Sequence, residues 1–246
     1  MKRVLTLTVL AAVSASTAGA ATNDSRLTVF AAASLTRVLP RIDKHPAYQF
    51  AGTNTLALQI QQGAPVDVFV SASPKYIVDL RNKGLLVGNP VWFLSNRIVL
   101  IVPHGNPAHI ARPADLTRPG VRLVIAAAGV PAGDYARKSL TAMHLDDALK
   151  NVVSNEPDVE GVVAKVVSGD ADAGFVYASD AKAVGSKVTK IPLPGSGRFT
   201  AAYGAAVVRN APNPQLARTF VAMLAAPHAQ ALLRAAGFGP APRAAR

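Results

Sequence analysis

The sequence predicts an α/β fold in which helices cover both faces of parallel β-sheets. Short apolar runs alternate with helix-patterned stretches along most of the chain, as in strand–helix–strand units. The run "RIVLIV" at residues 97–102 is apolar after its first residue, which is typical of a strand covered on both faces. The chain has 246 residues, half of them hydrophobic, so it can form one large domain or two modest ones.

The first half of the chain is predicted to alternate four extended segments with three helices. Pro40 interrupts the first helix, because proline cannot donate a hydrogen bond in a helix interior. In "GTNTLALQIQQG", Thr53 or Asn54 is a plausible N-cap and Gly63 ends the helix. The expected extended segments are residues 27–31, 48–50, 66–73 and 97–102, and the expected helices are residues 35–42, 53–62 and 74–83.

The second half repeats this alternation. A Pro/Gly loop and a final strand share the segment "IPLPGSGRFTAAYGAAVV", and an Arg/Ala/Pro tail without a pattern ends the chain. The expected strands are residues 122–126 and 173–177, and the expected helices are residues 134–143 and 159–167, with one or two more within 214–233.

Residues 1–20 have the pattern of a secretory signal peptide. Lys2 and Arg3 form the charged start, residues 4–13 the apolar core, and Ala18-Gly19-Ala20 the small-residue cleavage site. The apolar run is too short to span a bilayer, and no other transmembrane candidate follows. Because the chain has no cysteine, it can form neither a disulfide nor a lipidated N-terminus. We therefore expect a freely soluble mature protein in a bacterial periplasm.

The chain is basic, but its charge does not indicate a nucleic-acid partner. Removal of the signal peptide lowers the formal net charge from +12 to +10. The lysines and arginines are scattered, and aromatic residues are only 6% of the chain. An exported protein also seldom meets nucleic acid, so a solvated basic surface is the better interpretation.

Hydroxyl groups or very small residues stand at five strand or helix ends along the chain. In open α/β sheets, ligands bind beyond the carboxyl ends of the strands, at the helix N-termini. None of these places presents a lysine or an arginine. They are Ser34 in "AAS", Thr53 in "AGTNT", Ala132 in "GVPAGDYA", Val159 in "EPDVEG" and Tyr177 at the end of "AGFVY".

This pattern predicts an anion site built from neutral donors. Helix N-termini carry partial positive charge and unpaired N–H groups, and small residues let an anion approach them closely. A cage of donors alone matches a fully deprotonated oxyanion and rejects a protonated one, whose hydrogen finds no acceptor. Each feature alone has an ordinary explanation, since Ser34 and Thr53 also suit plain helix caps and Tyr177 suits a core position. Five such features at successive junctions favour the anion site.

Four segments carry a resemblance to a known family. "VFAAASLT", "TLALQIQQGAPVDVFVSAS", "VPAGDYA" and "DADAGFVYASDA" closely resemble periplasmic molybdate-binding proteins, the solute-binding components of ABC-type molybdate importers. The resemblance covers nearly all of the mature chain in the family's order. It implies a type II-like two-lobed periplasmic binding protein fold, with two chain crossings that form a hinge. The expected lobes are residues 22–96 with 203–246 (lobe I) and residues 97–202 (lobe II).

The resemblance also implies what is bound and how. The ligand is molybdate or tungstate, held by hydrogen bonds, with no cofactor and no metal coordinated directly by side chains. The expected partner is the membrane permease of the importer, and the protein is expected to be a monomer. By position in the family's motifs, the residues that hold the anion are Ser34, Thr53, Ala132, Val159 and Tyr177.

The chain departs from the family pattern in two places. Thr53 stands where a serine is more usual, which keeps the donor and adds a methyl group that narrows the pocket. The stretch between Ser34 and Phe50 is shorter than in the family and contains Pro40, which predicts a truncated first helix. A site in which carboxylates ligate the metal is not expected, since no Asp or Glu stands at the hydroxyl positions. We expect Asp158, beside Val159, to cap its helix or point away.

Two alternatives remain at this point. An enzyme is disfavoured, because the chain has no nucleophile elbow, zinc-ligand helix or P-loop and its five histidines are isolated. Within the binding class, the alternative ligand is another tetrahedral dianion, above all sulfate. Pocket size separates sulfate from the larger molybdate, and the sequence does not contain a pocket radius.

Overall fold

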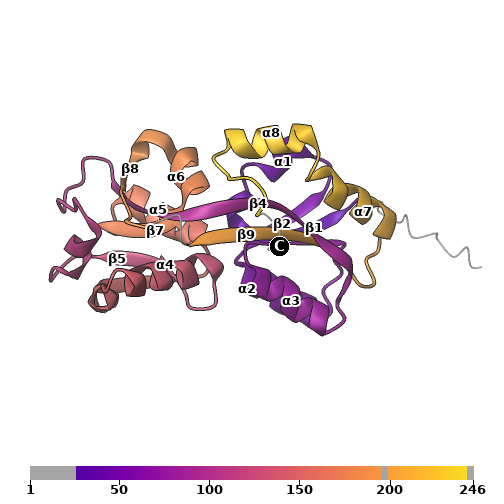
Figure 1. Cartoon of the computed structure of the whole chain (residues 1–246), viewed down its shortest axis with the longest axis horizontal. Helices are drawn as coiled ribbons and strands as arrows, with labels where there is room; N and C mark the ends of the chain where they lie inside the picture. Colours follow the sequence, from indigo (N-terminus) through magenta and orange to yellow (C-terminus); the bar gives the residue numbers. More distant parts are fainter. Residues whose placement is uncertain (1–25, 196–198, 243–246) are drawn as a thin grey trace, which may run out of the picture.

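The computed structural model describes residues 26–195 and 199–242. The predicted signal peptide at residues 1–20 and the expected start of lobe I at residue 22 lie outside the described residues. The described strands are arranged in the order β2-β1-β3-β9-β4-β7-β5-β6, with β8 beside β4. Helices lie on both sides of these strands (Figure 1), which confirms the predicted α/β fold.

Lobe I is the body built on β2, β1, β3 and β9. Its first three strands are parallel, and β9 runs antiparallel to β3. In Figure 1, α2 and α3 lie below these strands and α1, α7 and α8 lie above them. The elements are β1 (Thr28–Ala32), α1 (Leu39–Ile42), β2 (Ala47–Ala51), α2 (Thr53–Gln61), β3 (Val68–Ser71), α3 (Pro74–Asn82), β9 (Thr200–Val208), α7 (Pro214–Met223) and α8 (Pro227–Ala235).

Lobe II is the body built on β7, β5, β6 and β8. Strand β5 pairs in parallel with both β6 and β7, and helix α4 covers one face while α6 covers the other (Figure 1). Two 3₁₀ segments, η2 (Pro113–Thr117) and η3 (Asp146–Asn151), pack against each other. The elements are β5 (Leu123–Ala126), α4 (Pro131–Ala142), β6 (Val152–Glu156), α5 (Val159–Ser168), β7 (Ala173–Tyr177), α6 (Ala178–Val184), η4 (Gly185–Lys187) and β8 (Val188–Ile191).

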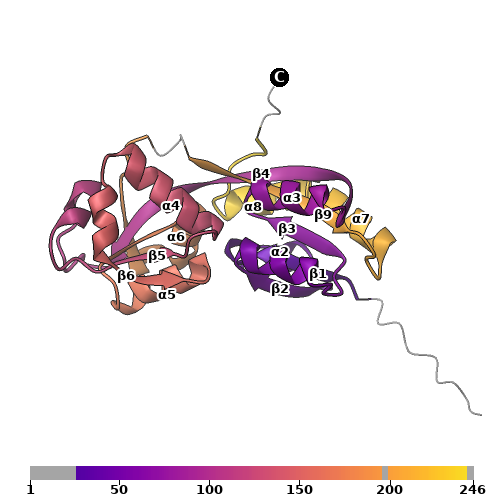
Figure 2. The ribbon, with the colours of Figure 1, turned by 90° about the horizontal axis from the view of Figure 1, so that it is seen from below.

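One long strand, β4 (Leu86–Pro103), runs through both lobes. Residues 86–97 pair antiparallel with β9, and residues 98–103 pair antiparallel with β7 and β8. Figure 2 shows β4 crossing from one lobe to the other, with α2 and α5 on the side of the molecule away from it. The expectation of parallel sheets is therefore incomplete, because the strands that join the lobes make both sheets mixed.

The structure corrects three local predictions. The first helix is divided into the 3₁₀ segment η1 (Ala33–Leu35) and α1, whose first turn accommodates Pro40 because an N–H has no partner there anyway. Neither Thr53 nor Asn54 is an N-cap, since Gly52 holds that position and makes no side-chain hydrogen bond. Helix α4 begins at Pro131 rather than at residue 134, which places Ala132 in its first turn.

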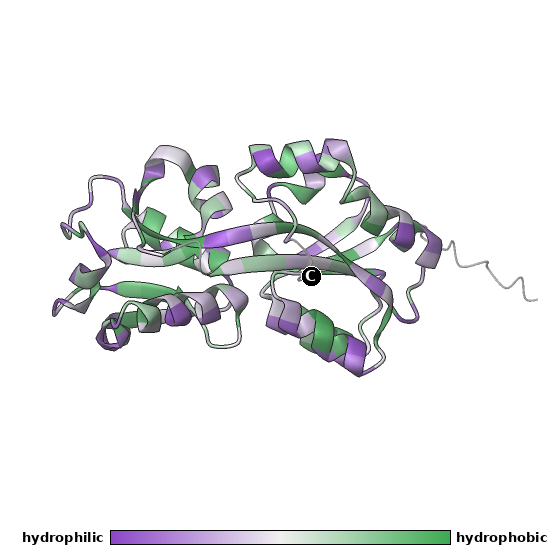
Figure 3. Cartoon of the chain, in the orientation of Figure 1, coloured by the Kyte–Doolittle hydropathy of each residue, from purple (hydrophilic) through white to green (hydrophobic). Residues whose placement is uncertain are grey.

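The hydrophobic core continues from one lobe into the other along β4. Phe93, Leu94, Ile98 and Leu100 are all buried and belong to one cluster that contains residues of both lobes. In Figure 3, the helices carry both hydrophobic and hydrophilic residues, as expected where one face of a helix packs on a sheet and the other faces solvent. Within the described part of the chain, no helix is long and apolar enough to cross a membrane.

Candidate anion-binding site

All five predicted site residues line one small cavity between the two lobes. Each comes from a different element: η1, the start of α2, the first turns of α4 and α5, and the end of β7. The cavity is small, about 20 Å³, which is room for a bound water or a small ion. The rest of the lining is dominated by very small residues, namely Ala32, Ala33, Ala51, Gly52 and Ala72.

Lobe I contributes two side-chain hydroxyl groups to this cavity, from Ser34 and Thr53. Both residues are buried. The Thr53 Oγ1 atom accepts a hydrogen bond from the Ala72 backbone N–H at 3.2 Å, so the Thr53 hydroxyl proton is free to be donated to another acceptor. The Ser34 Oγ atom lies 2.8 Å from the Tyr203 Oη atom. When Tyr203 donates in that pair, the Ser34 proton is likewise free.

Lobe II contributes backbone N–H groups from the first turns of α4 and α5. The Asp158 Oδ1 atom accepts from the Glu160 and Gly161 N–H groups at 2.9 and 3.1 Å, which confirms the prediction that Asp158 caps this helix. These two bonds leave the Val159 N–H, the first of α5, without an intrahelical partner. In α4, Pro131 has no N–H and the Asp134 N–H bonds to a carbonyl, so the Ala132 and Gly133 N–H groups remain.

Close backbone packing positions the N-terminus of α4. A Cβ atom at Gly133 would lie 2.1 Å from the Ala126 carbonyl oxygen and 2.4 Å from that of Ala127. Both are backbone atoms at the end of β5, so they cannot rotate away. Only glycine allows α4 to begin this close to the sheet, and this contact holds the Ala132 N–H at the cavity.

Tyr177 supplies a third hydroxyl group, from the end of β7. Its side chain is 2% exposed, and its Oη atom has no hydrogen-bond partner among the described residues. Burial raises the pKa of this phenol well above its ordinary value, with smaller contributions from Tyr203, Tyr135 and Asp180, so the group stays protonated and can donate. An unpaired buried hydroxyl costs about 1–3 kcal/mol. A ligand that offers an acceptor at this point removes that cost.

The site is neutral apart from one carboxylate that is already engaged. No lysine or arginine lines the cavity, and the Asp158 carboxylate faces the N–H groups of its own helix. The described residues contain no group of three or more metal-ligating side chains. The free polar hydrogens therefore come from hydroxyl and amide donors, which suits an anion with acceptors only.

Three residues of the site were missed from the sequence. Tyr203 pairs with Ser34, Gly133 sets the position of α4, and the Asp180 Oδ2 atom accepts from the Tyr177 backbone N–H at 3.0 Å. Tyr203 lies in the strand "TAAYGAAVV", whose pattern gives no reason to single it out. Gly133 is the neighbour of Ala132, and Asp180 follows Tyr177 by three residues, but the role of each depends on the packing of the folded chain.

The chain belongs to a family of bacterial extracellular solute-binding proteins, whose model matches residues 27–239. The molybdate-binding protein ModA of Mycobacterium tuberculosis (strain H37Rv) is 39% identical over 234 residues, covering 91% of this chain and 88% of that protein. The molybdate-binding protein ModA of Escherichia coli (strain K12) is 33% identical over 248 residues, covering 93% and 95%. These relatives are binding proteins, which agrees with the prediction that the chain is not an enzyme.

A solved structure shows the same fold. The periplasmic molybdate-binding protein of Azotobacter vinelandii superposes with a TM-score of 0.75 at 24% sequence identity, covering 89% of this chain and 100% of that one. The two-lobed binding-protein fold expected from the sequence is thereby confirmed.

Proposed function

We propose that this chain captures molybdate or tungstate outside the cytoplasm and delivers it to the membrane permease of an ABC importer. One observation carries the proposal: donors from both lobes line a single small cavity in which the buried Tyr177 hydroxyl lacks an acceptor. The names of the curated relatives, which are molybdate-binding proteins, support the same ligand. The proposed anion-binding residues are Ser34, Thr53, Ala132, Val159 and Tyr177.

The donor set explains how the site selects its ligand. Molybdate and tungstate have nearly the same size, charge and number of acceptors, so neutral donors barely distinguish them. Phosphate at neutral pH carries a proton, and to pair with it a hydroxyl of the site must accept instead of donate, which removes one donor from the anion. Each buried polar group left unpaired costs about 1–3 kcal/mol, so two such mismatches give a large preference.

Sulfate is the second candidate ligand, and Thr53 is the residue that favours it. The threonine methyl group takes up space in a cavity that is already small. A smaller cage fits sulfate better and strains the contacts to molybdate. Size is thus the property on which the assignment depends.

A calorimetric titration with the four anions tests the proposal. We expect molybdate and tungstate to bind with similar affinity, and sulfate and phosphate to compete poorly even in large excess. Sulfate binding as tightly as molybdate would overturn the molybdate assignment and leave the oxyanion site in place. Failure of all four anions to bind would overturn the site itself.

We also propose that residues 22–96 with 203–246 and residues 97–202 move as two lobes about a hinge that two chain crossings form, and that the protein is a periplasmic monomer. The continuous strand β4, which pairs with β9 in one lobe and with β7 in the other, supports a hinge near residue 97. Ligand is expected to bring the lobes together. Small-angle scattering with and without molybdate checks this, because an unchanged radius of gyration excludes closure, and the same data give the molecular mass.

A further inference from the structure

A side-chain contact between the lobes lies directly beside the start of α5. The Arg37 guanidinium of lobe I forms two hydrogen bonds with the Glu160 carboxylate of lobe II, at 2.6 and 2.7 Å. Arg37 follows Ser34 by three residues, and Glu160 is the neighbour of Val159 in the first turn of α5. The ion pair therefore ties a proposed donor segment of one lobe to a proposed donor helix of the other.

A second contact performs the same task at the start of α4. The Tyr76 hydroxyl of α3, in lobe I, donates to the Gly129 carbonyl oxygen of lobe II. Gly129 in turn donates its N–H to the Asp134 Oδ1 atom at 2.8 Å, which attaches this loop to the first turn of α4. Each lobe II helix whose N-terminus faces the cavity is thus held by one side chain of lobe I.

Between these two contacts the lobes meet without room for a side chain. A Cβ atom at Gly52, which precedes Thr53 in lobe I, would lie 2.5 Å from the Pro157 carbonyl oxygen of lobe II. The structure is therefore of the closed arrangement, and the Arg37–Glu160 and Tyr76–Gly129 contacts exist because the lobes are closed.

We propose that Arg37–Glu160 and Tyr76–Gly129 are two clasps that hold the closed state and set the rate at which the bound anion is released. The proposal rests on the proposed function. The four residues act as positioning residues, since none of them lines the cavity and each acts on the anion through a helix or segment that does. Both clasps form only after the lobes close, so they slow release and leave the rate of capture unchanged.

The Arg37–Glu160 clasp also solves an electrostatic problem. Glu160 places a negative charge one residue from the proposed Val159 donor, where it would repel an anion. Arg37 neutralises that charge by a bidentate pair, the geometry in which arginine binds carboxylates most strongly. The ion pair can thus act on anion release in two ways, through its charges or as a clasp. If only the charges matter, removing Arg37 and removing Glu160 change the release rate in opposite directions. If the pair is a clasp, both changes speed release.

The test measures release of radiolabelled molybdate, chased with unlabelled molybdate, from the full chain. Arg37→Gln and Glu160→Gln are each expected to speed release about two- to five-fold, the range for partly exposed ion pairs. Tyr76→Phe is expected to speed it about two- to ten-fold. The paired change Arg37→Glu with Glu160→Arg is expected to restore slow release. High salt should speed release from the parent protein and not from Arg37→Gln.

Two variants serve as matched controls. Arg41→Gln removes a neighbouring exposed cation whose side chain has no hydrogen bond or ion pair to the described residues. Tyr48→Phe removes a hydroxyl that donates to the Asp43 carbonyl oxygen at 2.7 Å within lobe I. Both are expected to release molybdate at the parent rate.

The outcomes separate the clasps from the proposed function. If the parent protein binds no molybdate in the calorimeter, the proposed function is wrong and the clasps fall with it. If it binds molybdate but Arg37→Gln and Tyr76→Phe release it at the parent rate, only the clasps are wrong. If Arg37→Gln and Glu160→Gln change the release rate in opposite directions, the ion pair acts only through its charges and is not a clasp.

Discussion

The two lobes contribute different kinds of donor to the same cavity. Lobe I offers the side-chain hydroxyl groups of Ser34 and Thr53, whereas lobe II offers the backbone N–H groups of Ala132 and Val159 together with the Tyr177 hydroxyl. A hydroxyl group is deleted by one substitution, but a backbone N–H can only be displaced. Lobe I is therefore specified by the identity of its site residues, and lobe II mainly by the packing around them.

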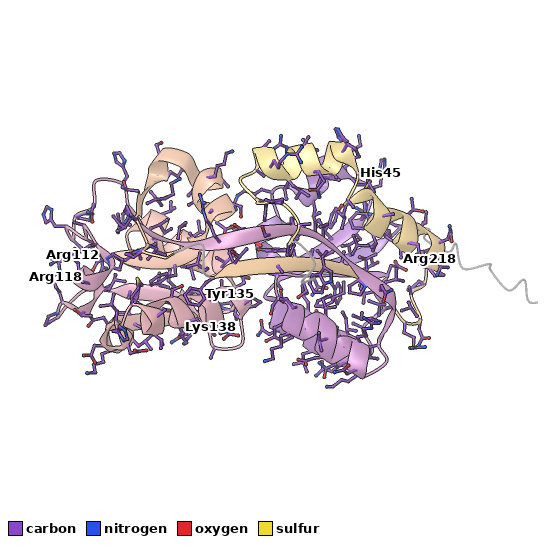
Figure 4. The ribbon with its side chains drawn as sticks, viewed as in Figure 1. His45, Arg112, Arg118, Tyr135, Lys138 and Arg218 are labelled. Carbon is purple, nitrogen blue, oxygen red and sulfur yellow. The ribbon has the colours of Figure 1, made fainter. Side chains whose placement is uncertain are left out.

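The lobes share one property, which is that neither places a formal cation in the cavity. The partial positive charges at the N-termini of α4 and α5 attract the anion instead, and the first residues of both helices are buried. Of the cations labelled in Figure 4, Arg112 and Arg118 lie at one end of the molecule, Arg218 lies at the other and Lys138 lies on α4, and none of them lines the cavity. No lysine or arginine among the described residues is buried, so these positive charges lie at the surface, as the scattered pattern in the sequence predicts.

The largest expected loss of affinity comes from a substitution that disturbs the backbone packing of lobe II. Gly133→Ala places a methyl group against two backbone carbonyls that cannot move aside, so the start of α4 must shift. Overpacking of this kind costs about 1–3 kcal/mol in stability. The Ala132 and Gly133 N–H groups are displaced together, and hydrogen bonds to charged groups are worth about 1.5–3 kcal/mol each, so molybdate affinity should fall about a hundredfold or more.

Gly161→Ala is the matched control for Gly133→Ala, at the start of the other lobe II helix. Its new Cβ would meet the side chain of Glu156, with the Oε2 atom nearest at 2.8 Å. The carboxylate can rotate away, and the Glu156 Cβ and Cγ atoms, at 3.1 and 3.3 Å, need to shift only slightly, so affinity measured by calorimetry should stay within a few-fold of the parent value. Equal losses in the two variants would show that backbone packing does not position α4.

The next prediction compares Ser34, whose hydroxyl group is hydrogen-bonded within the protein, with Tyr177, whose hydroxyl group is not. Ser34→Ala and Tyr177→Phe should each weaken molybdate binding about ten- to a hundredfold. Their effects on the ligand-free protein should differ. Ser34→Ala removes one hydrogen bond of the buried Tyr203 hydroxyl and should lower the free energy of unfolding by about 1 kcal/mol, whereas Tyr177→Phe removes an unpaired buried hydroxyl and should leave stability unchanged or raise it.

Thermal unfolding without ligand measures the stability of these variants, and calorimetry with molybdate measures their affinity. Tyr177→Phe that loses stability without ligand would mean that its hydroxyl has a partner in the protein. Parent-like affinity in both variants would mean that the donor cage lies elsewhere.

The sequence predicts the parts of the molecule that local patterns encode. Strand β7 is found at its observed bounds, and α5 to within one residue, because both have clean periodicity and clear ends. The first half of β4 was missed because Gly88-Asn89-Pro90 has the pattern of a turn, and the structure accommodates it by an irregular register. Tyr203 lies 169 residues from Ser34, and Glu160 lies 123 from Arg37, and local patterns contain no such pairings.

The smallest expected effect concerns Asp180, which supports Tyr177 from within lobe II. Asp180 is 1% exposed and accepts a hydrogen bond from the Tyr177 backbone N–H. Burial raises its pKa well above the ordinary value, and the charge of Glu160 adds to this, while the Tyr177 N–H, Arg37 and Ser179 oppose it. A carboxyl group with a raised pKa in the folded state contributes stability below its ordinary pKa, and that contribution is lost as the pH rises through the folded-state value.

Asp180→Asn keeps an acceptor for the Tyr177 N–H and removes the charge. The melting temperature of the variant minus that of the parent should therefore increase as the pH rises from about 4 to about 8. Asp172→Asn is the control, with a pKa shift of the opposite sign. Burial alone would raise the pKa of Asp172, but the hydrogen bonds and charge of Arg122 together lower it, so that carboxylate stabilises the protein above its ordinary pKa and stops doing so as the pH falls. The difference for Asp172→Asn should thus stay nearly constant from about pH 4 to about pH 8 and shrink only as the pH falls below the ordinary carboxyl pKa. A rise for Asp172→Asn that parallels the rise for Asp180→Asn would contradict the assignment of Asp180 as the carboxyl group that burial destabilises.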